Sequence, residues 1–346
     1  MRRVLTSEVL SASMEQRFHR RRAEEADHLV RLVYNQCSSP AGNNSVVDGR
    51  HVAQHFCGNM IRRLMFSKRH FVEPPPSSFS AGTAAGPGPE EVAHVDALFT
   101  LVNYVYSFSI SHYIPAWIIG LDIDGHKKVV KGVMETINRL HDPIVIEERI
   151  HERSTRGDKR EPRDFLDVLV SLQDSEEQPF LSLDEIRAQT AEIMFAIVDN
   201  PSNAVEWALA EMMNKPEVMQ KAIDELNTVV GKGRLVQESD LPRAFRLRPY
   251  HAFNPPHVAM QDTIVSGYFI PKDSHVFVSR VGLGRNSAVW ESPLEFRPER
   301  HMNNNSDSDV ARGCPGVSLG SSVTMMLFAR LPQGFTWSMP ASVHTM

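Results

Sequence analysis

Apolar side chains recur three and four residues apart along most of the chain, which is the spacing of one face of an α-helix. This spacing predicts helices in the first forty residues and over 46–71, 127–153, 186–213 and 317–331. From Pro249 onward, alternating apolar positions indicate extended structure, and residues 268–278 are typical of a strand, a turn and a second strand. The pattern therefore predicts a mainly α fold with a small β-sheet portion.

Local signals add a helix start and a loop. Ser182 and Glu185 have capping-box spacing, so each side chain can bond the backbone N–H of the other where the helix over 186–213 begins. Residues 74–89 are rich in Pro, Gly, Ser and Ala, which predicts a flexible loop without a core of its own. The sequence contains no internal repeat, and we expect residues 1–346 to form a single domain.

The helix predicted over 186–213 carries polar groups at its centre. Pro201 cannot donate a backbone hydrogen bond to the carbonyl group of Ile197, so a kink is expected there. Asp199 and Asn200 precede this proline in a helix that is otherwise apolar on most sides. Two interpretations stay open: a site that handles protons or oxygen, or a polar kink whose groups are satisfied within the protein and have only structural meaning.

Composition narrows the possible function classes. The chain has 346 residues and a formal net charge of -5, which gives no sign of a nucleic-acid partner. Its three cysteines, Cys37, Cys57 and Cys314, form no paired motif, which argues against a disulfide framework and for a reducing compartment. Since there is neither a run of 18 apolar residues nor a signal peptide, we expect the chain as written to be soluble and cytosolic.

The run from Arg312 to Gly316 holds one cysteine between two glycines at the entry to a predicted helix. The N–H groups of a helix N-terminus favour a thiolate, which is the form of Cys314 that binds a metal. Glycines allow a close approach to a large flat group, and Arg312 could hold a carboxylate. These features describe a haem-thiolate site. The alternative is that Cys314 is a small buried apolar residue.

Four separated segments together resemble the cytochromes P-450: 312–316, 296–300, 196–200 and 244–246. They match, in the order given, the loop of the haem ligand, the segment before it, the oxygen-handling central helix and the end of the Glu-x-x-Arg helix. Residues 198–207 and 250–259 resemble the plant branch that N-hydroxylates amino acids and releases aldoximes. In that branch an asparagine, here Asn200, commonly replaces the oxygen-handling threonine.

The resemblance implies an incomplete cytochrome P-450 fold and a haem-thiolate monooxygenase that converts an amino acid to an aldoxime. It would use molecular oxygen and electrons supplied by NADPH-cytochrome P-450 reductase, at the cytosolic face of the endoplasmic reticulum membrane. By the same resemblance, Cys314 would bind the haem iron, and Asp199 and Asn200 would be the catalytic residues. The residues expected to bind the cofactor are Arg246, His257, Arg300, Arg312, Gly313 and Gly316.

The chain also departs from the family pattern. We expect it to be truncated at its N-terminus, because the membrane anchor, the hinge and the first sheet of the family have no counterpart. We also expect an internal deletion before Arg243, which stands where the family has the glutamate of the Glu-x-x-Arg helix. Without this glutamate, a buried charge pair of the family would be broken. Such a loss costs about 3–5 kcal/mol of stability. The alternative function is therefore a catalytically inactive remnant or a non-enzymatic helical binding protein.

Overall fold

The computed structural model describes residues 2–38, 46–69, 89–105, 107, 109–110, 122–140, 143–156, 161–231, 233–235, 257–295 and 314–339. The chain divides into two compact units: one made of 1–241 with 310–346, the other of 242–309. The expectation that all 346 residues form one domain stays a prediction. The loop predicted over 74–89 lies outside the described residues as far as residue 88, and Pro89 begins a helix.

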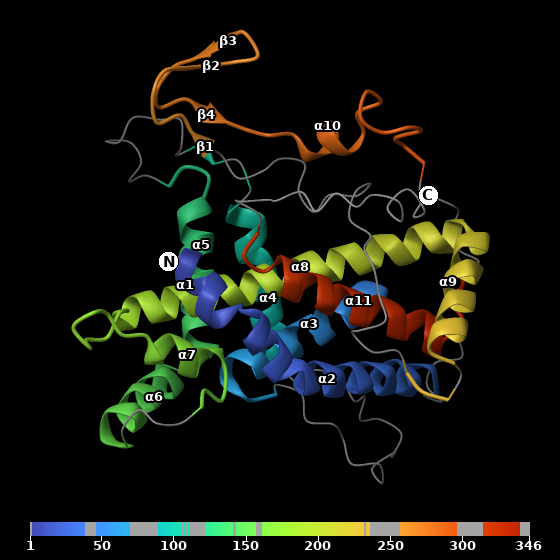
Figure 1. Cartoon of the computed structure of the whole chain (residues 1–346), viewed down its shortest axis with the longest axis horizontal. Coiled ribbons are helices and arrows are strands. Elements are labelled where there is room, and N and C mark those ends of the chain that lie inside the picture. The colour runs from blue at the N-terminus through green and yellow to red at the C-terminus, as the bar shows by residue number, and fades with distance from the viewer. Residues whose placement is uncertain are drawn as a thin grey trace. The chain divides into compact units, whose positions relative to one another are not determined.

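The described part of the first unit is helical (Figure 1). Its elements are α1 (Arg2–Val4), the π-helical η1 (Leu5–Val9), α2 (Ala12–Ser38), α3 (Gly49–Phe66), α4 (Pro89–Val105), α5 (His126–Leu140), α6 (Pro143–Arg156), α7 (Phe165–Ser171), α8 (Leu183–Asn214), α9 (Pro216–Val229) and α11 (Val317–Gly334). The mainly α fold predicted from the sequence is confirmed.

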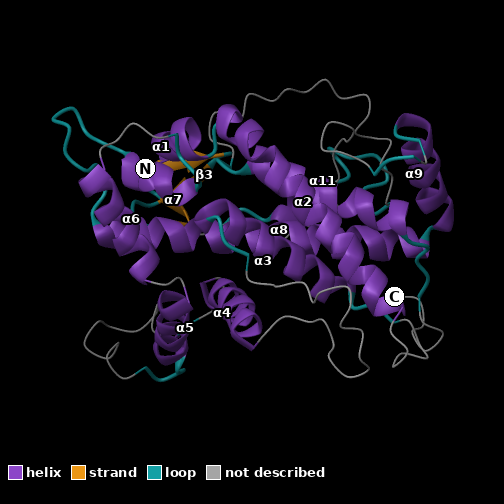
Figure 2. Ribbon diagram, turned by 90° about the horizontal axis from the view of Figure 1, so that it is seen from below, coloured by secondary structure: helices purple, strands orange, loops and turns teal. Residues whose placement is uncertain are grey.

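Helices α2, α3, α8 and α11 pack around a common core. Helix α3 contacts α2 and α8, and α11 contacts the same two helices, so the four run side by side in both ribbon views (Figures 1 and 2). Fully buried side chains from all four meet there, including Val33, Met60, Ile61, Leu64, Met194, Val323 and Leu327. Each large apolar side chain buried in this way stabilises the fold by roughly 1.5–3 kcal/mol. The core therefore fixes α8 and α11 against each other.

Two predicted helices are divided. The first forty residues form α1, η1 and α2, with a break at Leu10 and Ser11, where the Ser11 hydroxyl accepts a hydrogen bond from the backbone N–H of Met14. This bond occupies one of the unpaired N–H groups at the start of α2. The helix predicted over 127–153 is divided into α5 and α6, and Pro143 begins α6, a position that proline tolerates because no N–H is needed there.

The described part of the second unit contains the strands. Strand β2 (Thr263–Val265) pairs antiparallel with β3 (Tyr268–Ile270), and β1 (His257–Val258) pairs antiparallel with β4 (His275–Val276); α10 spans Arg280–Gly284. Ser266 and Gly267 have φ values of 52° and 84°, which is the type I′ turn whose twist suits a two-residue hairpin. The strand, turn and strand predicted over 268–278 are confirmed, although β3 and β4 each pair with an earlier strand.

Candidate functional site

Cys314 is exposed and lies just before α11, whose N-cap is Gly316. Its carbonyl group accepts a hydrogen bond from the N–H of Val317 at 3.2 Å, which forms the turn that leads into the helix. The thiol therefore lies at the N-terminal end of α11, which carries the partial positive charge of the helix dipole. Because the side chain is exposed, the alternative that Cys314 is a small buried apolar residue is wrong.

The other two cysteines are poorer metal ligands. Cys57 is completely buried in α3, and this burial raises the pKa of its thiol to about 12, so the thiol stays protonated. Cys37 is exposed and lies in the last turn of α2, at the end that carries the partial negative charge of the helix dipole. Among described residues no group of three or more His, Cys, Asp and Glu side chains could hold a metal ion. Of the three cysteines, Cys314 is the one that is both exposed and next to a helix N-terminus.

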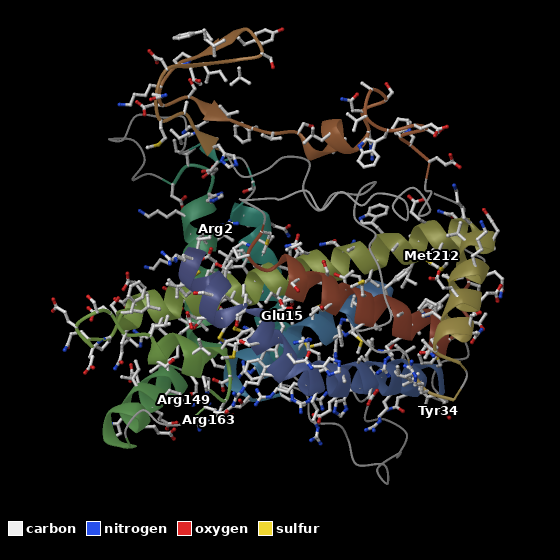
Figure 3. The ribbon with its side chains drawn as sticks, in the orientation of Figure 1. Arg2, Glu15, Tyr34, Arg149, Arg163 and Met212 are labelled. Atoms are coloured by element: carbon white, nitrogen blue, oxygen red, sulfur yellow. The ribbon has the colours of Figure 1, made fainter. Side chains whose placement is uncertain are left out.

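The start of α11 is held in place by the N-terminal part of the chain. The Ser318 hydroxyl donates to Oε2 of Glu15 at 2.6 Å, and Figure 3 marks Glu15 at this junction. Gly316 has φ −92°, and an added Cβ would lie 3.9 Å from Cδ1 of Leu10, which is an ordinary contact. Since no described neighbour requires glycine here, the cofactor-binding role of Gly316 stays a prediction.

Helix α8 continues through Pro201 with side-chain donors near the proline. Three side chains each donate to the carbonyl oxygen four residues earlier: Asn200 to Ala196 at 3.1 Å, Ser202 to Val198 at 2.6 Å and Asn203 to Asp199 at 3.1 Å. Such bonds are typical of polar residues inside a helix and supply donors around the missing N–H. These bonds pair donor groups of the polar centre. The carboxyl group of Asp199 and the amide oxygen of Asn200 are acceptors and take no part in them.

Asp199 is a buried carboxyl group. Burial raises its pKa to about 7, although the hydrogen bond from Asn203 and the charge of Arg50 both oppose this effect. Asn203 donates from Nδ2 to Oδ1 of Asp199 at 2.7 Å. A carboxyl group with this pKa can hold a proton or release it near neutral pH, which is what general acid and base catalysis requires.

Asn200 lies on an exposed line of α8. Glu192, Ala196 and Asn200 are exposed at intervals of four residues, while the helix on either side of this line is largely buried. The side chain of Ala196 is small and exposed. Because Nδ2 of Asn200 is used by the carbonyl oxygen of Ala196, its Oδ1 atom is the acceptor offered to a ligand. This open line on α8, together with the exposed thiol of Cys314, suits a haem.

The remaining predicted cofactor residues are His257, Arg246, Arg300, Arg312 and Gly313. His257 begins β1 in the second unit and is exposed, so its role stays a prediction. Arg246, Arg300, Arg312 and Gly313 lie outside the described residues. Cys314, Asp199 and Asn200 belong to the first unit, on the packed helices α8 and α11 or just before them.

Sequence reasoning missed that Asn203 binds the Asp199 side chain and that Glu206 lies on the same face of α8. Asn203 and Glu206 follow Asp199 at intervals of four and three residues, so all three share one face of α8. That spacing is readable in the sequence. The contribution of Arg50 from α3 is not, because it depends on how α3 packs against α8.

The fold and this site define a mainly helical protein with one exposed thiol at the start of a core helix. The family model described as "Cytochrome P450" matches residues 1–345, and the chain belongs to the cytochrome P-450 family. This family holds a haem iron, and a cysteine thiolate is its axial ligand.

Curated relatives cover almost the whole chain. It is 50% identical to tyrosine N-monooxygenase of Sorghum bicolor, over 99% of this chain and 64% of that protein. It is 47% identical to a phenylalanine N-monooxygenase of Prunus mume (98% and 66%) and 46% identical to valine N-monooxygenase 1 of Manihot esculenta (99% and 65%). The chain thus spans just under two thirds of the length of these proteins. Their names confirm the predicted resemblance to amino-acid N-hydroxylating relatives.

A solved structure shares the fold. The zebra fish cytochrome P-450 structure with progesterone aligns with a TM-score of 0.69 at 22% identity, over 99% of this chain and 75% of that one. The predicted fold class is therefore confirmed. Within the described residues, no helix has both the length and the apolar character needed to cross a membrane.

Proposed function

We propose that this chain carries the catalytic site of an amino-acid N-hydroxylase, which converts an amino acid to an aldoxime. The observation that supports this most is the exposed thiol of Cys314 at the start of α11, in a chain of the cytochrome P-450 family. The named activities of the relatives indicate the reaction and the substrate class. The proposal includes NADPH-cytochrome P-450 reductase as the electron donor and a location at the endoplasmic reticulum membrane.

Each described site residue has a defined part in this proposal. Cys314 would hold the haem iron through its sulfur atom, beside the open backbone at Gly316. When bound, the haem would supply the activation of molecular oxygen. Asp199 would hold a proton near the reacting groups, since its pKa is about 7. Oδ1 of Asn200 would accept a hydrogen bond from the amino group of the substrate, because its Nδ2 already donates to Ala196.

The relatives are named for tyrosine, phenylalanine and valine, so aromatic and branched amino acids are the substrates to test first. The purified chain would be supplied with haem, reductase, NADPH and oxygen, and the oximes would be measured by mass spectrometry. We expect an oxime from at least one of these amino acids. We also expect a loss of about tenfold or more for Asn200→Ala, because the substrate amine loses its acceptor. Haem-loaded protein that forms no oxime would contradict the proposal.

A second candidate is a catalytically inactive helical protein that has kept the family fold. Arg243 supports it, because the resemblance expects a glutamate at this position, which lies outside the described residues. The same assay separates the two. Haem binding without oxime formation, restored by Arg243→Glu, would support the second candidate, whereas oxime formation by the unaltered chain would exclude it.

A further inference from the structure

We propose that Arg50, from the first turn of α3, is a positioning residue that controls the charge of the buried Asp199 side chain across the interface between α3 and α8. The inference rests on the proposed function in one respect, which is the use of the Asp199 proton in a reaction. The electrostatic coupling itself exists in the folded chain without haem or substrate.

Three polar side chains, those of Asp199, Asn203 and Glu206, lie along one face of α8 from the interior to the surface. The Asp199 residue is 6% exposed, whereas the Glu206 side chain further along the same face is 28% exposed. Between them, Asn203 is half-buried and donates from Nδ2 to Oδ1 of Asp199 at 2.7 Å. Asp199 is therefore the buried end of this polar face, and Glu206 is its more exposed end.

Arg50 pairs with Glu206 at the more exposed end of this polar face. Its Nε and Nη2 atoms donate to Oε2 and Oε1 of Glu206, both at 2.8 Å, which is the two-pronged geometry that holds a guanidinium group most firmly. The hydrogen bonds and charge of Glu206 raise the pKa of Arg50, and the charges of Asp48 and Asp199 add to this. Glu206 thus fixes the position from which the positive charge of Arg50 acts on Asp199.

Besides burial and Arg50, the pKa of Asp199 responds to Asn203, which is a neutral amide. From α3, the thiol of Cys57 stays protonated because burial raises its pKa to about 12. Within α8, the hydroxyl of Ser202 donates to the carbonyl oxygen of Val198, and Asn203 is an amide. In the part of the chain that the structure describes, Arg50 is therefore the cation whose charge opposes the effect of burial on Asp199.

This arrangement gives opposite expectations for the two members of the surface pair. Arg50→Met removes the cation, so the negative form of Asp199 becomes less favourable and its pKa should rise. Glu206→Gln removes the anion that competes for Arg50, so the pKa of Asp199 should fall. A pair that only joined α3 to α8 would give no such opposition, since losing either partner breaks the same contact.

The test follows the Asp199 proton directly in the chain without haem. The infrared band of its protonated carboxyl group is identified as the band that Asp199→Asn removes, and its midpoint is measured against pH. Because the Arg50 side chain is 60% exposed, solvent screens its charge, so we expect Arg50→Met to increase proton affinity about twofold to fivefold and Glu206→Gln to decrease it. Arg50→Lys, which keeps the charge, should change the midpoint less than Arg50→Met.

Circular dichroism of each variant confirms that the helices are intact before titration. An unchanged midpoint in Arg50→Met, or shifts of the same sign in Arg50→Met and Glu206→Gln, would overturn the inference. Neither result depends on oxime formation, so the proposed function would stand or fall separately.

Discussion

Two buried aspartates in the first unit have opposite surroundings. Asp164, at the N-terminus of α7, is completely buried and is bound by a full set of donors. Arg149 donates from Nη1 and Nη2 at 3.1 and 3.0 Å, and Ser67 donates at 2.7 Å. Asp199, in the middle of α8, receives one side-chain hydrogen bond from a neutral amide and lies near a cation that is paired elsewhere.

The difference separates a carboxyl group that stabilises the fold from one that can exchange a proton. Although burial alone would lower the pKa of Arg149, its bonds to Asp164 and Asp167 raise it, so the guanidinium group stays charged. Figure 3 shows Arg149 beside Arg163, which also pairs with Asp167 and completes the cluster between α6 and α7. Asp199 has no such compensation, and its pKa of about 7 leaves both protonation states accessible.

The largest expected effect is on stability at α7. Asp164→Ala would remove the completely buried one of the two carboxylates that bind Arg149 and would leave the N-terminus of α7 without its cap, at a cost of about 3–5 kcal/mol. Urea unfolding followed by circular dichroism measures this loss. Glu135→Gln is the matched control, since this exposed side chain pairs with Lys131 at 3.9 Å and its loss should change stability by less than about 0.5 kcal/mol. Equal effects of the two substitutions would contradict the contrast.

The next effect concerns pH. The pKa of Asp199 is raised in the folded state, so the folded chain binds more protons than the unfolded chain between pH about 4 and about 7. Stability should therefore fall as pH rises through this window. For Asp199 alone the loss is about 2–3 kcal/mol between pH 5 and 8.

Asp199→Asn removes this titration, so the variant should gain stability relative to the original chain as pH rises. The measurement is the free energy of unfolding of both proteins at pH 5, 6, 7 and 8. A constant difference across these pH values would show that Asp199 is ionised in the folded state throughout.

A smaller effect is expected at the start of α8. The Ser182 hydroxyl accepts from the N–H of Glu185 at 3.4 Å, and the Glu185 carboxylate accepts from the N–H of Ser182 at 2.8 Å. Ser182→Ala removes one half of this capping box and should cost about 1 kcal/mol. The shift of the urea midpoint measures it, and Ser182→Asp, which keeps an acceptor, should recover most of the loss.

Local signals allowed much of the fold to be predicted. The helix over 186–213 agrees with α8, and its capping box forms as Ser182 and Glu185 predict. The helix expected over 317–331 agrees with α11 and places Cys314 at its start. These features depend on residues a few positions apart, which is the range over which sequence patterns are informative.

Features that depend on tertiary packing were beyond the sequence. Whether the thiols of Cys314 and Cys57 are exposed or buried depends on what packs around them. The influence of Arg50 on Asp199 crosses from α3 to α8, and the bond between Arg149 and Asp164 joins α6 to the start of α7. No periodic pattern reports such pairs, because their partners are set by how the helices pack.

Binding of haem by Cys314 is tested most directly by an optical titration of the purified chain with haem, beside Cys314→Ser and the matched control Cys37→Ser, which removes the other exposed cysteine. The chain and Cys37→Ser should both bind haem saturably and give the absorption spectrum of a thiolate-bound iron. Cys314→Ser should lose that spectrum. A thiolate spectrum that persists in Cys314→Ser, or disappears in Cys37→Ser, would show that Cys314 is not the iron ligand.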